Sequence, residues 1–229
     1  MGGYSPALAV ATGIFEFAAA LWTLTRRGRK RFLQPAAALL LLLAGYQFAE
    51  VAVCTGSAAQ VWSRWAFFDI TWLPPMGIWL VAALGFSGLR GPRIFALVYF
   101  AVAAGFGVWI FADPNCITRS VCQIVTARYG HPSMFEWTYG AFYQFGLAVM
   151  IFGASAGLAR TDDPILRKHL ANIQAGVLGF VLPAFIVRVL TPEPAGLMPS
   201  VMCHFALVLA LSLVALVLRE SRFADSLNP

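Results

Sequence analysis

Residues 25–54 read TRRGRKRFLQPAAALLLLLAGYQFAEVAVC, and they join a basic cluster to a long apolar run. Five of the first seven residues are Arg or Lys, whereas residues 34–54 hold a single charge, Glu50. An apolar segment of about 20 residues is long enough to cross the hydrocarbon core of a bilayer as a helix. The stretch therefore predicts a transmembrane helix over 34–54 that follows a basic loop.

The rest of the chain has a similar composition. Of the 229 residues, 60% are hydrophobic and 11% are charged, against roughly 25% charged residues in an ordinary soluble domain, which excludes a water-soluble globule. Apolar runs separated by charged residues predict an all-α, single-domain bundle of seven transmembrane helices over 1–229. The spans are expected at about 6–25, 34–54, 63–87, 94–112, 136–158, 171–191 and 198–218.

The basic residues indicate the orientation of the bundle. Twelve of the sixteen Lys and Arg residues fall in connections on one side, and only Arg119 and Arg128 fall in the opposite loops. Because cytoplasmic loops carry an excess of Lys and Arg, we expect the N-terminus outside and the C-terminus in the cytoplasm. The net charge of +6 is thus a topology signal. No basic stripe alternates with aromatic residues, so we expect no nucleic-acid partner.

The short cytoplasmic tail limits what the chain can do alone. About ten residues follow Arg219, too few for an effector domain, so we expect a signal to pass to a separate membrane partner. Gly153-x-x-x-Gly157 is a motif of close helix packing, and it marks either an internal helix contact or a homodimer face. Membrane lipids are expected partners in any case.

The longest connection is the outer loop 113–135, which contains Cys116 and Cys122. In an oxidising compartment we expect these two residues to form a disulfide, with two free thiols as the alternative. Their spacing does not resemble a usual zinc site. A bridge between Cys54 and Cys203, near the outer ends of their spans, is a less favoured possibility than two buried thiols.

Polar side chains inside the predicted spans are the candidate site residues, since each charge in hydrocarbon costs about 2.5–3.5 kcal/mol. Glu16 lies at mid-depth, and the others share one layer towards the outer side. They are Glu50, Asp69, Tyr143, Gln144, Arg188 and His204. Seven packed helices can point these groups at a common cavity, so we expect an outward-facing ligand pocket lined by them and by Trp72.

The third span carries a stripe of tryptophans around one carboxylate. The spacing of three and four residues places Trp62, Trp65, Asp69, Trp72, Met76 and Trp79 on one side of a helix. One interpretation is an aromatic packing stripe, with the first two indoles anchored at the membrane interface. The other is the wall of a ligand site that uses stacking, cation–π contact and the charge of Asp69. Pro74-Pro75 is expected to kink the span just below Asp69.

Two further uses of the charged layer remain open. Arg188 pairs with Glu50 or Asp69 in a purely structural interpretation, which leaves one acid over. Alternatively Glu50, Asp69 and His204 hold a metal ion, although each comes singly from a different helix. A retinal Schiff base is not expected, because Lys30 and Lys168, the only lysines, both fall in cytoplasmic connections.

Two families show motifs similar to these. The run Trp62-Ser63-Arg64 through Trp72-Leu73-Pro74-Pro75, with the basic pair Arg167-Lys168 before the last two spans, resembles the seven-helix N-terminal sensory region of some bacterial histidine kinases. That resemblance implies an N-out seven-helix fold and a sensory role.

The second resemblance covers most of the chain. It is to seven-helix bacterial membrane proteins that begin with Met-Cys-aromatic-Ser, carry an outer loop with cysteines and have Met-Pro-x-x-x-Cys at the last span. Tyr4-Ser5, the two loop cysteines and the stretch Met198 to Cys203 match, whereas Gly3 stands where that family has cysteine. The resemblance implies the fold and a bacterial inner-membrane location, and no activity.

Together these features predict a ligand-binding or sensory membrane protein that acts through a partner. The first alternative is an intramembrane metal-dependent hydrolase or redox enzyme. The second is a transporter or an accessory subunit of a membrane complex. The inner halves of the spans are almost purely apolar, with Asn172 and Gln174 the main exceptions, and this favours binding over transport.

Overall fold

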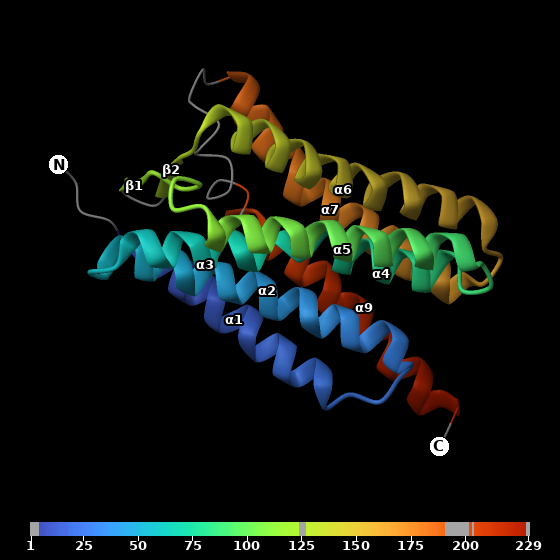
Figure 1. The fold of residues 1–229 in the computed structure, drawn as a ribbon. Helices are drawn as coiled ribbons and strands as arrows, with labels where there is room; N and C mark the ends of the chain where they lie inside the picture. Colours follow the sequence, from blue (N-terminus) through green and yellow to red (C-terminus); the bar gives the residue numbers. More distant parts are fainter. Residues whose placement is uncertain (1–4, 124–126, 191–201, 203, 228–229) are drawn as a thin grey trace.

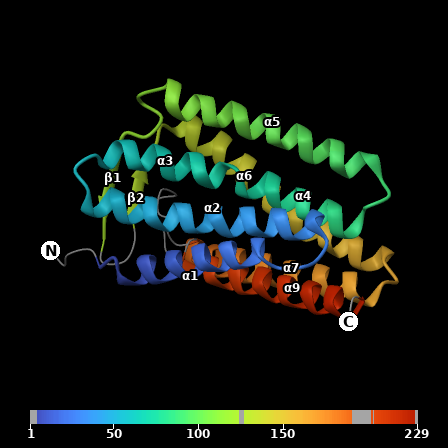
Figure 2. The same ribbon diagram turned by 90° about the horizontal axis from the view of Figure 1, so that it is seen from below.

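Helix α2 (Lys30–Thr55) is the central helix of the bundle (Figure 2). The structure, a computed structural model, describes residues 5–123, 127–190, 202 and 204–227, without the side chains of residues 187, 188 and 227. Helix α2 packs against α1 (Ala7–Leu24), α3 (Ala59–Thr71), α4 (Leu73–Gly85) and α9 (Ala206–Leu227). Its buried leucines, among them Leu39, Leu40 and Leu43, form the centre of the core.

The remaining helices complete the bundle. Helix α5 (Arg90–Ala112) packs against α3 and α4, α6 (Ser133–Arg160) against α4 and α7, and α7 (Pro164–Leu190) against α9. Figure 1 shows that these helices run along a common direction, with the C-terminus at the end of the bundle away from the N-terminus. Large apolar side chains on their outer surfaces are exposed, such as Val108 and Phe152, as expected where helices meet lipid.

Within the described residues, six helical segments are long and apolar enough to cross a membrane. They are α1, α2, α3 together with α4, α5, α6 and residues 164–186 of α7. The prediction of an all-α membrane protein is thereby confirmed. The last predicted span, 198–218, falls partly outside the described residues, and the second half of α9 carries four charges, Arg219, Glu220, Arg222 and Asp225.

The third predicted span is broken into two helices. Helix α3 ends at Thr71 and α4 begins at Leu73, with Trp72 between them. Pro74 and Pro75 have no N–H to donate to the carbonyls of Ile70 and Thr71, four residues earlier, so the helical hydrogen bonding is interrupted at this point. The hydroxyl of Thr71 donates to the carbonyl of Phe67. The predicted kink just below Asp69 is therefore present.

Helices α4 and α6 approach closely at glycine. A Cβ on Gly85 would lie 2.9 Å from the Cα of Gly157, and a Cβ on Gly153 would lie 3.0 Å from Val81. Gly157 is buried in this contact and Gly153 lies half-buried beside Val81, so the predicted motif forms an internal helix contact, one of the two alternatives.

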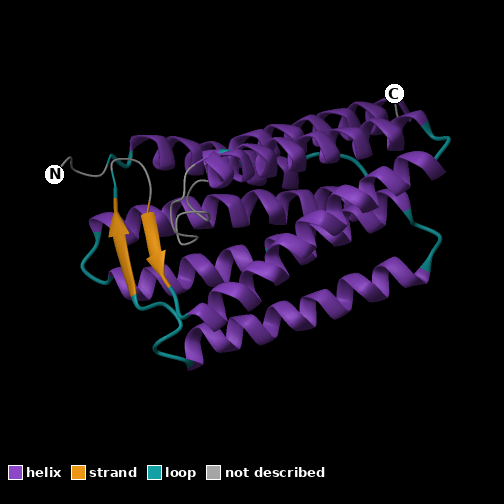
Figure 3. Ribbon diagram, turned by 90° about the horizontal axis from the view of Figure 1, so that it is seen from above, coloured by secondary structure: helices purple, strands orange, loops and turns teal. Residues whose placement is uncertain are grey.

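The outer loop holds the only β-strands among the described residues. Strands β1 (Arg119–Cys122) and β2 (Ala127–Gly130) pair antiparallel, with Arg119 opposite Gly130 and Cys122 opposite Ala127. Figure 3 shows this hairpin at one end of the helices, the end nearer the N-terminus.

Candidate functional site

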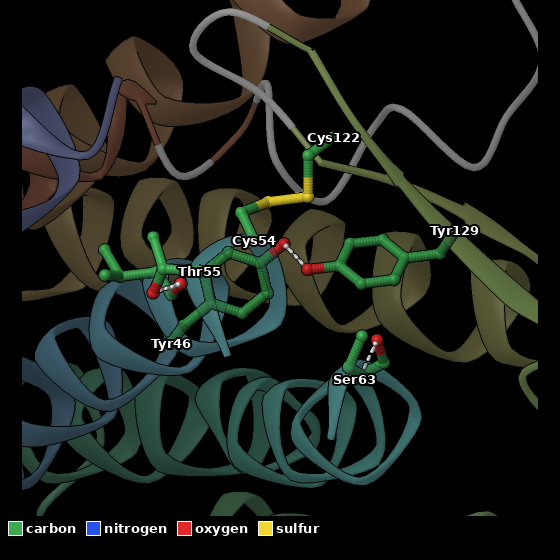
Figure 4. Close-up of a disulfide and its surroundings, with 8 residues drawn as sticks. Tyr46, Cys54, Thr55, Ser63, Cys122 and Tyr129 are labelled. Carbon is green, nitrogen blue, oxygen red and sulfur yellow. Dashed lines mark hydrogen bonds between the residues drawn. A yellow bond between two sulfur atoms is a disulfide. The ribbon is translucent and has the colours of Figure 1, made fainter. Parts of the chain in front are cut away.

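A disulfide between Cys54 and Cys122 ties the hairpin to the end of α2 (Figure 4). The Cα atoms are 5.7 Å apart. The other side of the loop is held by α3, since Gln60 Nε2 donates to the carbonyl of Ile117 at 3.1 Å and Arg64 Nη2 to that of Pro114 at 2.9 Å. The outer loop is thus fastened across the mouth of the bundle at two helices.

This pairing corrects the predicted Cys116–Cys122 disulfide. Strand β1 alone holds the Cα atoms of Arg119 and Cys122 about 10 Å apart, because an extended strand rises about 3.3 Å per residue. Cys122 is carried towards α2, while Cys116 stays behind as a buried free thiol. Burial, followed by the nearby charge of Asp113, raises the pKa of Cys116 to about 12. Cys203, the suggested partner of Cys54, lies outside the described residues.

A layer of tyrosines lies beneath the hairpin. Tyr129 of β2 points down to α2, where its hydroxyl lies 3.4 Å from the hydroxyl of Tyr46 (Figure 4). The hydroxyl of Tyr139 in α6 lies 3.1 Å from the hydroxyl of Thr71. The ring of Tyr139 stacks on the ring of Tyr143, with centroids 6.2 Å apart. All four tyrosines are buried, so the layer offers hydroxyl groups inside the protein.

Phe67 of α3 joins the two sides of this layer. Its ring contacts Tyr129, His131, Phe135 and Tyr139. The Nδ1 atom of His131 lies 3.2 Å from the carbonyl of Cys116, and because a carbonyl only accepts, this nitrogen carries the proton. Burial lowers the pKa of His131, against the effect of that hydrogen bond. The histidine is therefore a neutral member of the aromatic cluster at pH 7.

Glu50 is the acidic group beneath the hairpin. Tyr46, Glu50 and Cys54 follow each other at steps of four, on one face of α2, and the first and last of them both contact the hairpin. Glu50, between them, is 1% exposed. It faces the protein interior, as the cost of a carboxylate in lipid predicts.

Asp69 of α3 contacts a different face of α2 from the face that carries Glu50. A Cβ on Gly45 would come 2.6 Å from Asp69 Oδ1, and Gly45 is five residues, about 140° around the helix and 7.5 Å along it, from Glu50. Glu16 of α1, which is fully buried, lies close enough to Asp69 for the two carboxylates to interact electrostatically. The predicted acidic layer is therefore divided: Glu50 lies under the hairpin, and Asp69 lies deeper with Glu16, a partner that the sequence did not indicate.

Two of the other predicted site residues, Trp72 and Gln144, do not join the residues beneath the hairpin. Trp72 packs its ring on Phe68 and Phe100, in agreement with the packing interpretation of the stripe. Gln144 is exposed, because Phe142 and Tyr143 take the inward positions of that turn of α6. His204 is partly buried at the start of the last helical segment, and the side chain of Arg188 lies outside the described residues.

The metal-site alternative finds no support in the described part of the chain. No group of three or more His, Cys, Asp or Glu side chains there is arranged to hold a metal ion. For Glu50 and Asp69 the reason is visible, since Asp69 of α3 lies against Gly45, on a different side of α2 from Glu50. The set of Glu50, Asp69 and His204 is therefore not formed as predicted.

Sequence reasoning missed a polar cluster at the opposite end of the bundle. The backbone N–H, Nε and Nη2 of Arg29 all donate to the Glu220 carboxylate, and His169 Nε2 donates to Glu220 Oε2 at 3.2 Å. Gly28 has a φ of +151°, and a side chain there would meet Glu220. These residues are far apart in the sequence, so no local spacing links them. In the sequence Arg29 is only one of five basic residues in the first connection.

Comparisons with known proteins add no function to this arrangement. No protein-family model matches the chain, and no curated protein matches it significantly.

Proposed function

We propose that this protein is a receptor-like, seven-helix protein of the bacterial cytoplasmic membrane that binds a small ligand beneath the outer hairpin. The N-terminus lies outside, so the hairpin faces the outer compartment, and the signal passes through helix movement to a partner membrane protein or a second copy. The resemblance to sensory regions of histidine kinases agrees with this role.

The position of Glu50 carries the proposal. It lies on α2 between the two contacts that hold the hairpin, and it is 1% exposed. Ligand sites combine apolar and aromatic walls with a few convergent polar groups. Here the walls are the rings around Phe67, and the polar groups are Glu50 and the tyrosine hydroxyls. A carboxylate among aromatic rings suits a ligand with a cationic or hydrogen-bond-donating group.

The ligand is tested by what the protein retains on purification. Wild type, Glu50→Gln and the control Asp225→Asn, an exposed acid at the other end of the bundle, are purified in mild detergent. Small molecules released on denaturation are then identified by untargeted mass spectrometry. We expect a molecule retained by wild type and control and reduced at least tenfold in Glu50→Gln. Equal retention in all three proteins, or none above an empty-vector preparation, overturns the proposal.

A purely structural role for Glu50 gives a different result. If Glu50 only forms an ion pair such as the one predicted with Arg188, Glu50→Gln lowers the thermal midpoint without changing the bound molecules. Tyr129→Phe separates the two cases, because it removes one hydroxyl from the layer and leaves every charge in place. A ligand bound by this layer is then partly lost, while an ion pair is unaffected.

The orientation is tested by labelling with a membrane-impermeant maleimide. Val121 is an exposed position on β1, and Asp162 is an exposed position in the connection from α6 to α7. We expect Val121→Cys to react in intact cells and Asp162→Cys only after lysis. The reverse pattern contradicts the N-out arrangement.

A further inference from the structure

We propose that a groove between α4, α5 and α6 binds an anionic glycerophospholipid. The lipid belongs to the membrane leaflet on the side where most Lys and Arg residues of the chain lie. The groove has a volume of about 170 Å³. Its lining is apolar and includes Ile78, Val81, Phe86, Gly91, Phe95 and Gly153. This site is separate from the one beneath the hairpin, and the proposal does not depend on the function of that site.

Missing side chains keep the groove open. A Cβ on Gly91 would meet nothing within 4 Å, and one on Gly153 would touch only Val81 at 3.0 Å. Because neither glycine has a side chain, the groove is not filled at Gly153 or at Gly91. An unbranched apolar chain fits such a space without moving the helices.

The length of the groove matches one leaflet. Its lining runs from Phe86, just after the end of α4, back to Ile78. Eight helical residues span about 12 Å, and half of a hydrocarbon core is about 15 Å thick. The groove therefore follows the direction of a lipid tail, with one end in the headgroup region.

Three arginines gather at the headgroup end. Arg90 and Arg93 flank the lining residues Gly91 and Pro92, and Arg93 Nη2 donates to the carbonyl of Ser87 at 2.9 Å. The guanidinium of Arg160 lies over the ring of Phe86, 5.4 Å from its centroid. Arg93 and Arg160 contact the segment that forms the mouth of the groove, and Arg90 adjoins it in the sequence.

The charge at this mouth is not neutralised by the protein. In the described part of the chain no acidic side chain forms an ion pair with these arginines. The nearest acids in the sequence are Asp162, which is exposed, and Asp163, whose Oδ1 accepts the N–H groups that begin α7. An apolar groove that ends in unneutralised guanidinium groups fits a ligand with a tail and an anionic phosphate head.

Native mass spectrometry of the full-length protein tests the site. The probes are phosphatidylglycerol and phosphatidylcholine with identical acyl chains, added to delipidated protein in detergent. We expect wild type to bind phosphatidylglycerol at least about tenfold more tightly, since each arginine near a membrane surface favours an anionic lipid. Equal binding of the two lipids overturns the proposal, because it leaves only non-specific tail contact.

Two matched pairs of variants locate the binding. We expect one triple variant to lose the preference for phosphatidylglycerol: Arg90→Gln, Arg93→Gln and Arg160→Gln. The control removes the same charge elsewhere at this end of the bundle and should retain the preference: Arg27→Gln, Arg167→Gln and Arg222→Gln. Gly91→Leu fills the groove and should weaken binding at least tenfold. Gly105→Leu, on the same helix and also with nothing within 4 Å of its Cβ, should not. Equal effects within either pair contradict the assignment to this groove.

Discussion

Arg29 and Glu220 are 191 residues apart in the chain, and Arg29 Nε and Nη2 each donate a hydrogen bond of 2.7 Å to a different oxygen of the Glu220 carboxylate. Glu220 follows the last predicted span and is buried, while the Arg29 side chain is 29% exposed. This bidentate pair fastens the loop between α1 and α2 to α9 and, through His169, to α7.

Glu220→Gln is expected to lower the free energy of unfolding by about 2 kcal/mol. The change leaves Arg29 with a neutral acceptor, and removing one partner of a fully buried pair costs about 3–5 kcal/mol, a range reduced here because Arg29 is partly in solvent. Unfolding in a titration of denaturing detergent measures the loss. The exposed neighbour Arg222→Gln is the control, and equal stability of the two variants refutes the expectation.

The same pair makes stability depend on pH in the acid range. Burial raises the pKa of Glu220, but the hydrogen bonds from Arg29 and His169 outweigh it and lower the pKa from 4.5 to about 2. A lowered pKa means that the stabilisation is complete above pH 4.5 and is lost as the pH falls towards 2. Thermal midpoints measured across this window should decline more in wild type than in Glu220→Gln. Parallel curves would show that other groups control the acid transition.

Breaking the disulfide is expected to loosen the hairpin. Cys122→Ser opens a loop of about 70 residues, which the chain-entropy estimate values at about 4 kcal/mol. Limited proteolysis should then cut the outer loop faster than in wild type. Non-reducing tryptic mapping identifies the bond directly, because cleavage after Arg119 places Cys116 and Cys122 on different peptides. A linked peptide that contains Cys116 would restore the pairing predicted from sequence.

Cys116 is expected to resist alkylation while the protein is folded. Its pKa is raised to about 12 by burial and by Asp113, so at pH 8 almost no thiolate is present to react. Treatment with a maleimide before and after denaturation, followed by peptide mapping, compares the two states. Rapid labelling of Cys116 in the folded protein would contradict its position beneath the outer loop.

Gly45→Ala is expected to destabilise the protein by about 1–3 kcal/mol, as overpacking does. The new Cβ would lie 2.6 Å from Asp69 Oδ1, and the double variant with Asp69→Ala should recover part of the loss. Gly140→Ala is the matched control, since a Cβ on this helical glycine meets nothing within 4 Å and Ala favours the helix. Additive effects of the two changes would show that the residues do not touch.

The sequence predicts the helices well because their physical signal is local. Apolar runs between charges locate six membrane-capable segments, and Pro74-Pro75 locates the break beside Trp72. The burial of Glu50 also follows from sequence alone, since a carboxylate in a span has to turn away from lipid.

Contacts between distant residues are what the sequence does not reveal. The sequence analysis paired Cys122 with Cys116, its neighbour in the loop, and only the extended strand β1 carries Cys122 to Cys54. Tyr143 and Gln144 are adjacent polar residues in the same predicted span, and the sequence does not show which of them faces inward. The packing of α6 buries Tyr143 and exposes Gln144. Arg29 and Glu220 give no local signal, because their pairing depends on how α9 returns to the first loop.

The bond between Cys54 and Cys122 also has a consequence for how the protein is made. It closes a covalent ring that contains α3, α4 and α5, so it forms only after Cys122 has been synthesised and five of the helices have left the ribosome. In the proposed orientation both thiols meet in the oxidising compartment, whereas a molecule inserted upside down keeps them in the reducing cytosol. The closed ring is thus a chemical mark of correct insertion, carried only by molecules whose hairpin reached the outer side.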